Sequence, residues 1–351
     1  MDTPQRLPKD KMRKDKIVDH LVQMGLSGDL LSSDFLSDSL ISTYLDFFER
    51  YLKEASKGGA KKKDLICLAN QYLKEILQQI ANPFAFEIFH KGIRSPFDYY
   101  HFGLELIRPL VDFSKSSVEG LPYLQEIQKA LTLQENVILL SNHQIEPDPQ
   151  AIALLLEKTT PDLAKNIIFV AGHRVITDPI AVPLSKGVNL LCIFSKNYIE
   201  HPIEQKREKQ LHNIRSMQKL SELLSEGGKC IYVAPSGGRD RPLPDGTMKV
   251  SAFNENSVEL FRLMALKAKT PTHFYTLALD TYHLQPPPKS IADARDELRI
   301  VNFTPIHLQF GPQIPMERFF TKGCDKNLAK AECTQYIWNQ VNNSYINISC
   351  K

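Results

Sequence analysis

The chain has 351 residues, more than one compact domain usually contains, so its length predicts two domains or one large domain with an added segment. Its 42% hydrophobic and 24% charged residues are typical of a globular protein in water. A formal net charge of +3 is too small to indicate nucleic-acid binding, although it suits anionic small substrates or an acidic partner.

The first part of the chain, residues 1–80, is predicted to be helical because apolar side chains recur at intervals of three and four residues. SKGGAKKK (56–63) interrupts this pattern as an exposed connection, and Asn82-Pro83 ends it. We therefore predict a small helical bundle domain over residues 1–80, followed by a second domain over residues 81–351.

From about residue 84 onward, short apolar runs alternate with helical stretches. This alternation predicts an α/β domain around a mainly parallel or mixed central sheet. The expected strands are NVILL (136–140), NIIFVAG (166–172), VNLLCIF (188–194), KCIYVA (229–234) and HFYTLAL (273–279).

The first candidate site is SNHQIEPDP (141–149), directly after an expected strand. Interpreted as strand, turn and helix, it places His143 in a loop and Asp148 as the N-cap of a helix that begins at Pro149. Ligands of open α/β sheets bind outside the carboxyl ends of the strands. An aspartate beside a histidine there fixes its tautomer and stabilises its protonated form, as a general base requires. The motif is short, and its spacing alone favours the simpler interpretation, in which Asp148 is only a helix cap and His143 an incidental loop residue.

The next strand is followed by AGHRVITD (171–178), which could bring further cations to the same crevice. An ion pair between Arg174 and Asp178 is the simpler interpretation of this segment.

A second candidate site, PSGGRDRP (235–242), also follows a strand directly. Its two glycines let the backbone approach a ligand closely. Arg239 and Arg241 are two apart, so in extended chain they project to the same side and offer paired guanidinium groups to a phosphate. The alternative is that both arginines pair with Asp240 or with surface acids.

A long charged helix is predicted from about Pro202 to Glu226, where Gly227-Gly228 stops it. Lys206, Arg207 and Lys209 lie on the flank of this helix, which is either a solvated face or a docking ridge for an acidic partner. The apolar face is expected to comprise Leu211, Ile214, Met217, Leu220 and Leu224.

Other chemistry is poorly supported by the sequence. There is no HExxH motif or compact His/Cys/Asp cluster, so no metal site is predicted. The six cysteines lack CxxC spacing, which favours a reducing compartment with Cys192 and Cys230 buried. No segment reaches the roughly 20 apolar residues of a membrane span. The charged start, MDTPQRLPKDKMRKDK, does not resemble a signal peptide. We expect a cytoplasmic location, or the plastid stroma if the source has plastids.

Five motifs taken together carry a resemblance to a known family. PFDYYHFGLELIRPLVDF, NHQxExDP, FVAGxRVxTDP, NLLCxxSK and APSGGRDRP resemble, in order and at suitable spacings, the soluble plastid-type glycerol-3-phosphate 1-O-acyltransferases. The resemblance runs from about Pro83 to about Pro315. It implies an α/β acyltransferase domain with a helical bundle ahead of it.

This resemblance implies acyl transfer from acyl-acyl carrier protein, or acyl-CoA, to the sn-1 hydroxyl of glycerol 3-phosphate, giving lysophosphatidic acid. His143 would take the hydroxyl proton, Asp148 would orient His143, and Arg239 and Arg241 would hold the phosphate. A thioester is already activated, so no cofactor or metal is implied. Transient contact with the membrane that receives the product is compatible with this activity.

The chain departs from the plant pattern after Ser195-Lys196. Asn197 and Tyr198 stand where the plant enzymes carry a Lys-His pair among their phosphate ligands. Both side chains can donate hydrogen bonds, but the positive charge is gone. Two other activities remain alternatives: a 1-acyl-glycerol-3-phosphate acyltransferase, with the same His-x4-Asp chemistry, and a non-catalytic module that binds an acyl carrier or phospholipid.

Overall fold

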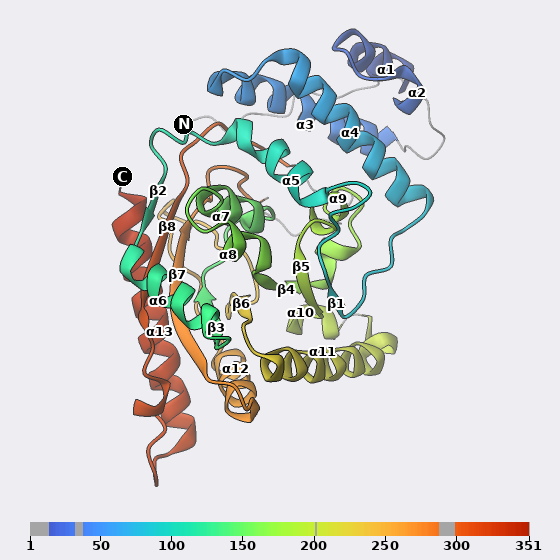
Figure 1. The fold of residues 1–351 in the computed structure, drawn as a ribbon. Helices are drawn as coiled ribbons and strands as arrows, with labels where there is room; N and C mark the ends of the chain where they lie inside the picture. The colour runs from blue at the N-terminus through green and yellow to red at the C-terminus, as the bar shows by residue number, and fades with distance from the viewer. Residues whose placement is uncertain (1–13, 32–37, 201, 288–298, 351) are drawn as a thin grey trace.

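The computed structural model describes residues 14–31, 38–200, 202–287 and 299–350 (Figure 1). The N-terminal part is helical, as predicted. Its elements are α1 (Lys14–Gln23), α2 (Gly28–Leu31), α3 (Asp38–Ala55), the short η1 (Ser56–Gly58) and α4 (Lys62–Ala81). The expected interruption falls between α3 and α4, where Gly59 has a φ of 80°, and α4 ends directly before Asn82-Pro83.

In the described part of the chain, eight strands form one mixed sheet in the order β1-β5-β4-β6-β3-β7-β8-β2. Strands β5, β4, β6, β3 and β7 are parallel, β1 and β8 are antiparallel to their neighbours β5 and β7, and β2 is parallel to β8. The predicted mixed sheet and its five expected strands are therefore confirmed. The strands are β1 (Phe89–His90), β2 (Ser117–Glu119), β3 (Asn136–Ser141), β4 (Ile168–Gly172), β5 (Asn189–Ile193), β6 (Cys230–Val233), β7 (Thr272–Asp280) and β8 (His307–Gln313).

Helices cover both faces of this sheet. Because successive side chains of a strand point to opposite faces, Val137 and Leu139 of β3 join one apolar cluster and Ile138 and Leu140 join the other. The first cluster includes side chains of α5 (Tyr99–Ile107), α6 (Leu121–Thr132), α7 (Asp148–Leu156) and α8 (Pro161–Asn166). The second includes side chains of α11 (Lys206–Glu226), α12 (Glu255–Lys267) and α13 (Lys326–Ser349). Strands buried on both faces are continuously apolar, which is why β3 was visible in the sequence.

The N-terminal helices pack onto the α/β part, and in Figure 1 they lie beyond α5 and α9 (Val182–Ser185). Aromatic side chains of α3 and α4 belong to the same apolar cluster as α5–α8. The hydroxyl of Tyr72 in α4 donates to the carbonyl of Ile180 at 2.6 Å, and Arg50 Nε in α3 donates to the carbonyl of Val301 at 2.7 Å. The division into two domains at residue 80 stays a prediction.

Helix α11 follows η4 (Ile203–Gln205) and ends before Gly227, close to the predicted bounds. Its buried face differs from the prediction, because Leu211 and Ile214 are 46% and 55% exposed. Polar side chains of α11 instead face the end of β5: Ser216 Oγ donates to the carbonyl of Cys192 at 2.7 Å, and Asn213 Nδ2 donates to the carbonyl of Phe194 at 2.8 Å. These bonds rotate the first half of α11 away from the expected packing. Within the described residues, no helix combines the length and the apolar character that a membrane crossing requires.

Candidate active site

His143 and Asp148 lie at the carboxyl end of β3, and their side chains meet. Nδ1 of His143 is 2.7 Å from Oδ2 of Asp148. The helix begins one residue earlier than predicted, because α7 starts at Asp148 with Pro147 as its N-cap. The Asp148 carboxylate therefore turns back over the preceding loop and does not cap α7.

The Asp148 carboxylate is held from several sides and is only 1% exposed. Oδ2 also accepts the backbone N–H groups of Gln144, at 2.8 Å, and Ile145, at 3.3 Å. Oδ1 accepts the hydroxyl of Thr281, just beyond β7, at 2.6 Å. An ionised carboxylate can only accept hydrogen bonds, so Nδ1 of His143 must carry the proton that it donates. This fixes the tautomer and leaves Nε2 as the basic nitrogen.

The His143 side chain is reachable from solvent, with 32% of it exposed. No described residue forms a hydrogen bond with its Nε2. A buried carboxylate behind an accessible imidazole is the arrangement that a general base needs, because the carboxylate stabilises the imidazolium formed after proton transfer.

The loop that carries His143 is tied to both neighbouring strands. Asn142 Nδ2 donates to Asp240 Oδ2 at 3.0 Å and to the Leu279 carbonyl at 2.9 Å, while its Oδ1 accepts the Leu279 N–H at 2.8 Å. The backbone N–H of Asp240 donates to the carbonyl of His143 at 2.6 Å. The two candidate motifs are thus joined. Asn142 lies inside the first motif, but its bonds to Asp240 and Leu279 depend on the fold and could not be predicted from that motif.

Arg239 and Arg241 flank a buried residue. Asp240 is 0% exposed, its carboxylate accepts bonds from Asn142 and from the backbone of Ser251 at 2.8 Å, and burial raises its pKa. The two arginines are partly exposed, and Nη1 of Arg241 lies 3.5 Å from the carbonyl oxygen of Arg239. The motif therefore brings both guanidinium groups to the same edge of the sheet as His143.

The glycines ahead of these arginines leave the backbone open. Gly237 has a φ of +69°, a conformation that favours glycine. A Cβ placed on Gly237 or Gly238 would meet no described atom within 4 Å. A ligand can therefore approach this backbone closely.

Two acidic residues, Glu146 and the buried Asp178, and a further arginine interact with Arg239 or with one another. Arg299 is 4% exposed and its guanidinium bonds to Glu146, with Nε 3.2 Å from Oε2, and to the carboxylate of Asp178. The ion pair expected between Arg174 and Asp178 is thus replaced by one between Arg299 and Asp178. Nothing in the sequence linked Arg299 to this place, since it lies more than a hundred residues from either acid.

The electrostatics show how closely these groups interact. Burial alone would raise the pKa of Glu146, but the positive charge of Arg299, and then those of Arg239 and Arg174, lower it. Burial lowers the pKa of Arg239, and the negative charge of Glu146 opposes this. Burial raises the pKa of Asp178, although Arg299 opposes the rise.

The segment after β5 forms α10 (Lys196–Ile199). The side chain of Asn197 lies outside the described part of the chain, and that of Tyr198 is 44% exposed. Lys209 is only 7% exposed, and its Nζ donates to the Tyr198 carbonyl at 3.0 Å. Lys209 is therefore an interior cation that supports α10, and its proposed place on an exposed docking ridge is not what the structure shows.

Two histidines lie next to this segment: His173, which belongs to the segment AGHRVITD (171–178), and His212 of α11, which lies in none of the motifs. The ring of His173 stacks on Phe194 with centroids 4.3 Å apart, and His212 contacts Phe194 edge-on at 5.1 Å. Burial lowers the pKa of His173, and the charges of His212 and Lys209 act in the same direction. These side chains supply ionisable groups close to the end of β5 and to α10.

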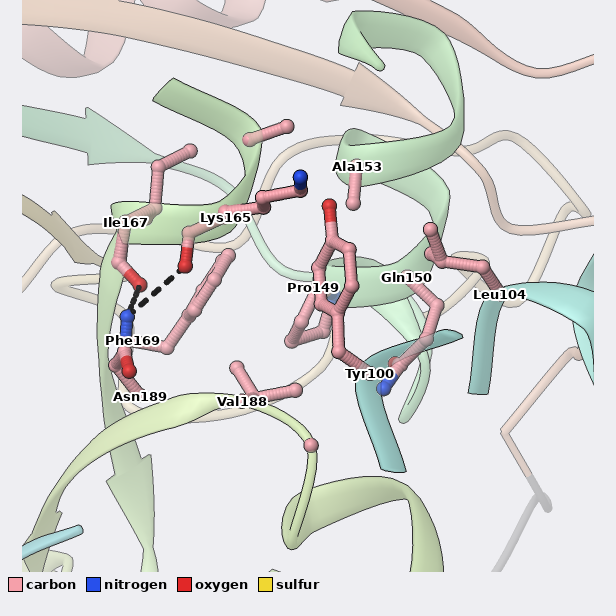
Figure 2. A pocket seen from close by; sticks show the side chains of 12 residues that line it. Tyr100, Leu104, Pro149, Gln150, Ala153, Lys165, Ile167, Phe169, Val188 and Asn189 are labelled. Atoms are coloured by element: carbon pink, nitrogen blue, oxygen red, sulfur yellow. Dashed lines mark hydrogen bonds between the residues drawn. The ribbon is translucent and has the colours of Figure 1, made fainter. Parts of the chain in front are cut away.

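A pocket lies beside α7, directly after Asp148 (Figure 2). Apolar side chains of several elements form its walls, including Leu104, Ala153, Phe169 and Val188, and Asn189 Nδ2 donates to the carbonyl of Lys165 at 3.1 Å. None of the predicted site residues lines it.

Comparison with known proteins agrees with this geometry. A family model described as Acyltransferase matches residues 115–329. A chloroplastic glycerol-3-phosphate acyltransferase of Cucurbita moschata is 40% identical over 275 residues, or 78% of this chain and 60% of that protein. The chloroplastic enzyme of Spinacia oleracea is 40% identical over 85% of this chain and 64% of that protein, and that of Pisum sativum is 37% identical over 88% and 68%.

Among solved structures, the 1-acyl-sn-glycerophosphate (LPA) acyltransferase PlsC of Thermotoga maritima aligns with a TM-score of 0.43 and 19% identity, over 72% of this chain and 79% of that chain. The chain spans 60% and 64% of the length of the first two plant relatives. Since the family model covers more than half of the chain and the plant proteins are similar over most of it, this chain belongs to the acyltransferase family, in its plastid-type glycerol-3-phosphate acyltransferase branch.

Proposed function

We propose that this protein transfers an acyl chain from a thioester donor, acyl-acyl carrier protein or acyl-CoA, to the sn-1 hydroxyl of glycerol 3-phosphate. The product is 1-acyl-glycerol 3-phosphate. The observation that carries this proposal is the 2.7 Å contact between His143 and Asp148, on the same edge of the sheet as Arg239 and Arg241. The names of the plant relatives, which are glycerol-3-phosphate acyltransferases, support the choice of acceptor.

In the proposed mechanism, Nε2 of His143 takes the proton of the sn-1 hydroxyl as the oxygen attacks the thioester carbonyl. Asp148 holds the imidazole and stabilises the imidazolium, which then returns its proton to the thiolate that leaves. The new ester bond forms as the thioester bond breaks, so no covalent acyl-enzyme is required. Holding both substrates in reach of each other supplies much of the rate increase.

The phosphate of the acceptor is proposed to bind to Arg239 and Arg241. Guanidinium groups suit this role because their planar, fixed donors match phosphate oxygens and keep their charge at all working pH values. Asn197 and Tyr198 are proposed as neutral hydrogen-bond donors at the same phosphate. Lys209, whose Nζ donates to the Tyr198 carbonyl, would then provide part of the positive charge that a Lys-His pair provides elsewhere.

The carrier is proposed to dock on the exposed start of α11, through Lys206 and Arg207. The plant relatives are described as chloroplastic. We propose that this protein works in the plastid stroma, or in the cytoplasm if its source lacks plastids.

The test is an incubation of the purified protein with acyl-acyl carrier protein and radiolabelled glycerol 3-phosphate, followed by extraction into an organic phase. Label in the organic phase, absent with His143→Ala, is the expected result. Replacing the acceptor with 1-acyl-glycerol 3-phosphate tests the second acylation. Turnover of that acceptor alone would contradict the proposal, as would binding of the donor without any turnover.

A further inference from the structure

The ion cluster around Arg299 joins three segments that are far apart in the sequence. Glu146 belongs to the loop of His143, Asp178 follows β4, and Arg299 comes from the segment between β7 and β8. Asp178 and Arg299 are buried, with 0% and 4% of their side chains exposed, and Glu146 is largely covered, with 13% exposed. Burial alone would lower the pKa of Arg299, but the charges of Glu146 and Asp178 more than offset it and raise that pKa.

The charges of this region act on one another. Arg299, Arg239 and Arg174 all lower the pKa of Glu146, and the charge of Glu146 opposes the lowering of the Arg239 pKa by burial. Without Arg299, the Glu146 carboxylate would lose the cation with which it forms an ion pair. Its negative charge would then act on Arg239, one of the two proposed phosphate-binding residues, with less compensation.

We propose that Arg299 is a positioning residue for the phosphate site. It supplies the charge that compensates Glu146 and Asp178, and it keeps the Glu146 carboxylate turned away from the phosphate that Arg239 binds. The inference rests on the proposed function, because it assumes that a phosphate binds at Arg239 and Arg241. It adds a residue that lies in none of the motifs and that touches no substrate itself.

The geometry explains why an arginine is needed at this position. One guanidinium contacts two carboxylates from different segments, with Nε and Nη2 toward Glu146 and Nη2 also toward Asp178. A lysine carries its charge at a single nitrogen, which cannot bind both carboxylates in the geometry of the planar guanidinium group. Arg299→Lys should therefore preserve the charge balance but hold Glu146 less firmly than the arginine does.

The cluster also borders the N-terminal helices. A small pocket is lined by Glu146 and Arg299 together with Phe47, Tyr51 and Tyr72 of α3 and α4. Burial raises the pKa of Tyr72, and the charges of Arg299, Glu146 and Asp178 all act on it. The low-dielectric surroundings that these rings provide strengthen the interactions within the cluster.

The first test measures binding of inorganic phosphate and of glycerol 3-phosphate to Arg299→Met by calorimetry, together with steady-state kinetics. We expect both dissociation constants, and the KM for glycerol 3-phosphate, to rise roughly ten- to a hundred-fold, with a much smaller change in kcat. Arg299→Lys should fall between wild type and Arg299→Met.

A matched control separates this effect from a loss of fold. Arg262 in α12 is also nearly buried, at 9% exposed, and its Nε lies 2.8 Å from Oε2 of Glu259. Helix α12 packs in the apolar cluster on the face of the sheet opposite to α7. Arg262→Met should lower the melting temperature without changing phosphate binding. If Arg262→Met and Arg299→Met raise the dissociation constants equally, Arg299 acts only through stability and the proposal is wrong.

The second test is a rescue. Adding Glu146→Gln to Arg299→Met removes the uncompensated carboxylate and should restore most of the lost affinity for inorganic phosphate, although the fold has lost two ion-pair partners. A double variant that binds phosphate as weakly as Arg299→Met would overturn the charge argument. The proposed function itself fails in a different way, since wild type would then bind glycerol 3-phosphate without acylating it.

Discussion

At the scale of single residues, the site depends on one nitrogen of His143. The carboxylate of Asp148 accepts a hydrogen bond from Nδ1, and the imidazole is partly exposed, so Nε2 is the nitrogen available to the substrate. The Asp148 carboxylate also accepts bonds from two backbone N–H groups and from Thr281, so it cannot easily rotate away. A histidine restrained in this way loses little entropy when the acceptor hydroxyl arrives.

If Nε2 is the base, His143→Ala should lower turnover by about 100- to 10,000-fold while the KM for glycerol 3-phosphate changes little, because the imidazole acts mainly in the transition state. Initial rates at saturating donor and varied acceptor measure both constants. Retention of more than about a tenth of the wild-type turnover would exclude this role. Thr281→Val, which removes one bond to Asp148, should give a smaller loss.

Arg239→Ala and Arg241→Ala should have the opposite kinetic pattern. Arginines that hold the phosphate both before and during the reaction contribute uniform binding, so the KM for glycerol 3-phosphate should rise far more than turnover falls. Losing one charged contact costs about 1.5 to 3 kcal/mol, or roughly ten- to a hundred-fold in affinity. Acceptor saturation curves test this, and an unchanged KM in both variants would remove these residues from the site.

What could be predicted at this scale depended on distance along the chain. His143 and Asp148 share one short motif, as do Arg239 and Arg241, so the residue types and the turn between them were informative. Thr281 and Arg299 act on those motifs from 133 and 153 residues away. Neither lies in a recognisable motif, and only the folded sheet brings them to the site.

At the scale of elements, α11 shows how polar side chains can redirect a helix. Its periodic apolar residues predicted that Leu211 and Ile214 would be buried. Bonds from Asn213 and Ser216 to the end of β5 determine the orientation instead, and these two aliphatic side chains face outward. The spacing of apolar residues carries no information about such hydrogen bonds. The length of α11 could therefore be predicted, but the side of its first turns that is buried could not.

The exposed start of α11 gives a prediction about the donor. Lys206→Glu combined with Arg207→Glu should raise the KM for acyl-acyl carrier protein by roughly five- to thirty-fold and flatten its salt dependence, while acyl-CoA is affected less. Donor saturation at two ionic strengths measures this. Lys62→Glu with Lys63→Glu, two exposed lysines of α4, is the matched control. Equal effects on both donors would place carrier docking elsewhere.

The strands differ in how well the sequence predicts them. β3 is buried on both faces and is apolar throughout, so it was predicted almost to the residue. β8 contains Gly311-Pro312 and mixes apolar with polar residues, so no continuous apolar run marks it in the sequence. β1 and β2 have two and three residues, too few to produce a pattern.

At the scale of the whole molecule, the N-terminal helices and the sheet share a core, and buried ionisable groups lie where they meet. His90 in β1 is 5% exposed, contacts the rings of Phe84 and Phe86, and its Nε2 bonds to the Lys186 carbonyl at 3.0 Å. Burial lowers its pKa, so the folded state favours the neutral ring.

This shift predicts a dependence of stability on pH. A histidine whose pKa is lower in the folded than in the unfolded chain contributes stability above the unfolded pKa of about 6.5, and this contribution is lost as the pH falls below it. Each pKa unit is worth about 1.4 kcal/mol. His90→Gln should therefore lose less stability than wild type between about pH 7.5 and about pH 5.5, as measured by denaturant unfolding. His101→Gln, at an exposed position, should behave like wild type.

The place of β3 in the middle of the sheet has a consequence for biosynthesis. It pairs with β6 and β7, which are synthesised about 90 and 135 residues later, as the pairs Val137–Cys230 and Asn136–Thr272 show. The loop that carries His143 and Asp148 therefore leaves the ribosome long before Thr281, Leu279 and Arg299 exist to hold it. Until the last third of the chain is made, β3 has two apolar faces and two unpaired edges, the features that make nascent chains slow to fold and prone to aggregate. The topology that protects the finished site thus makes its assembly a late event, completed only when nearly all of the chain has been translated.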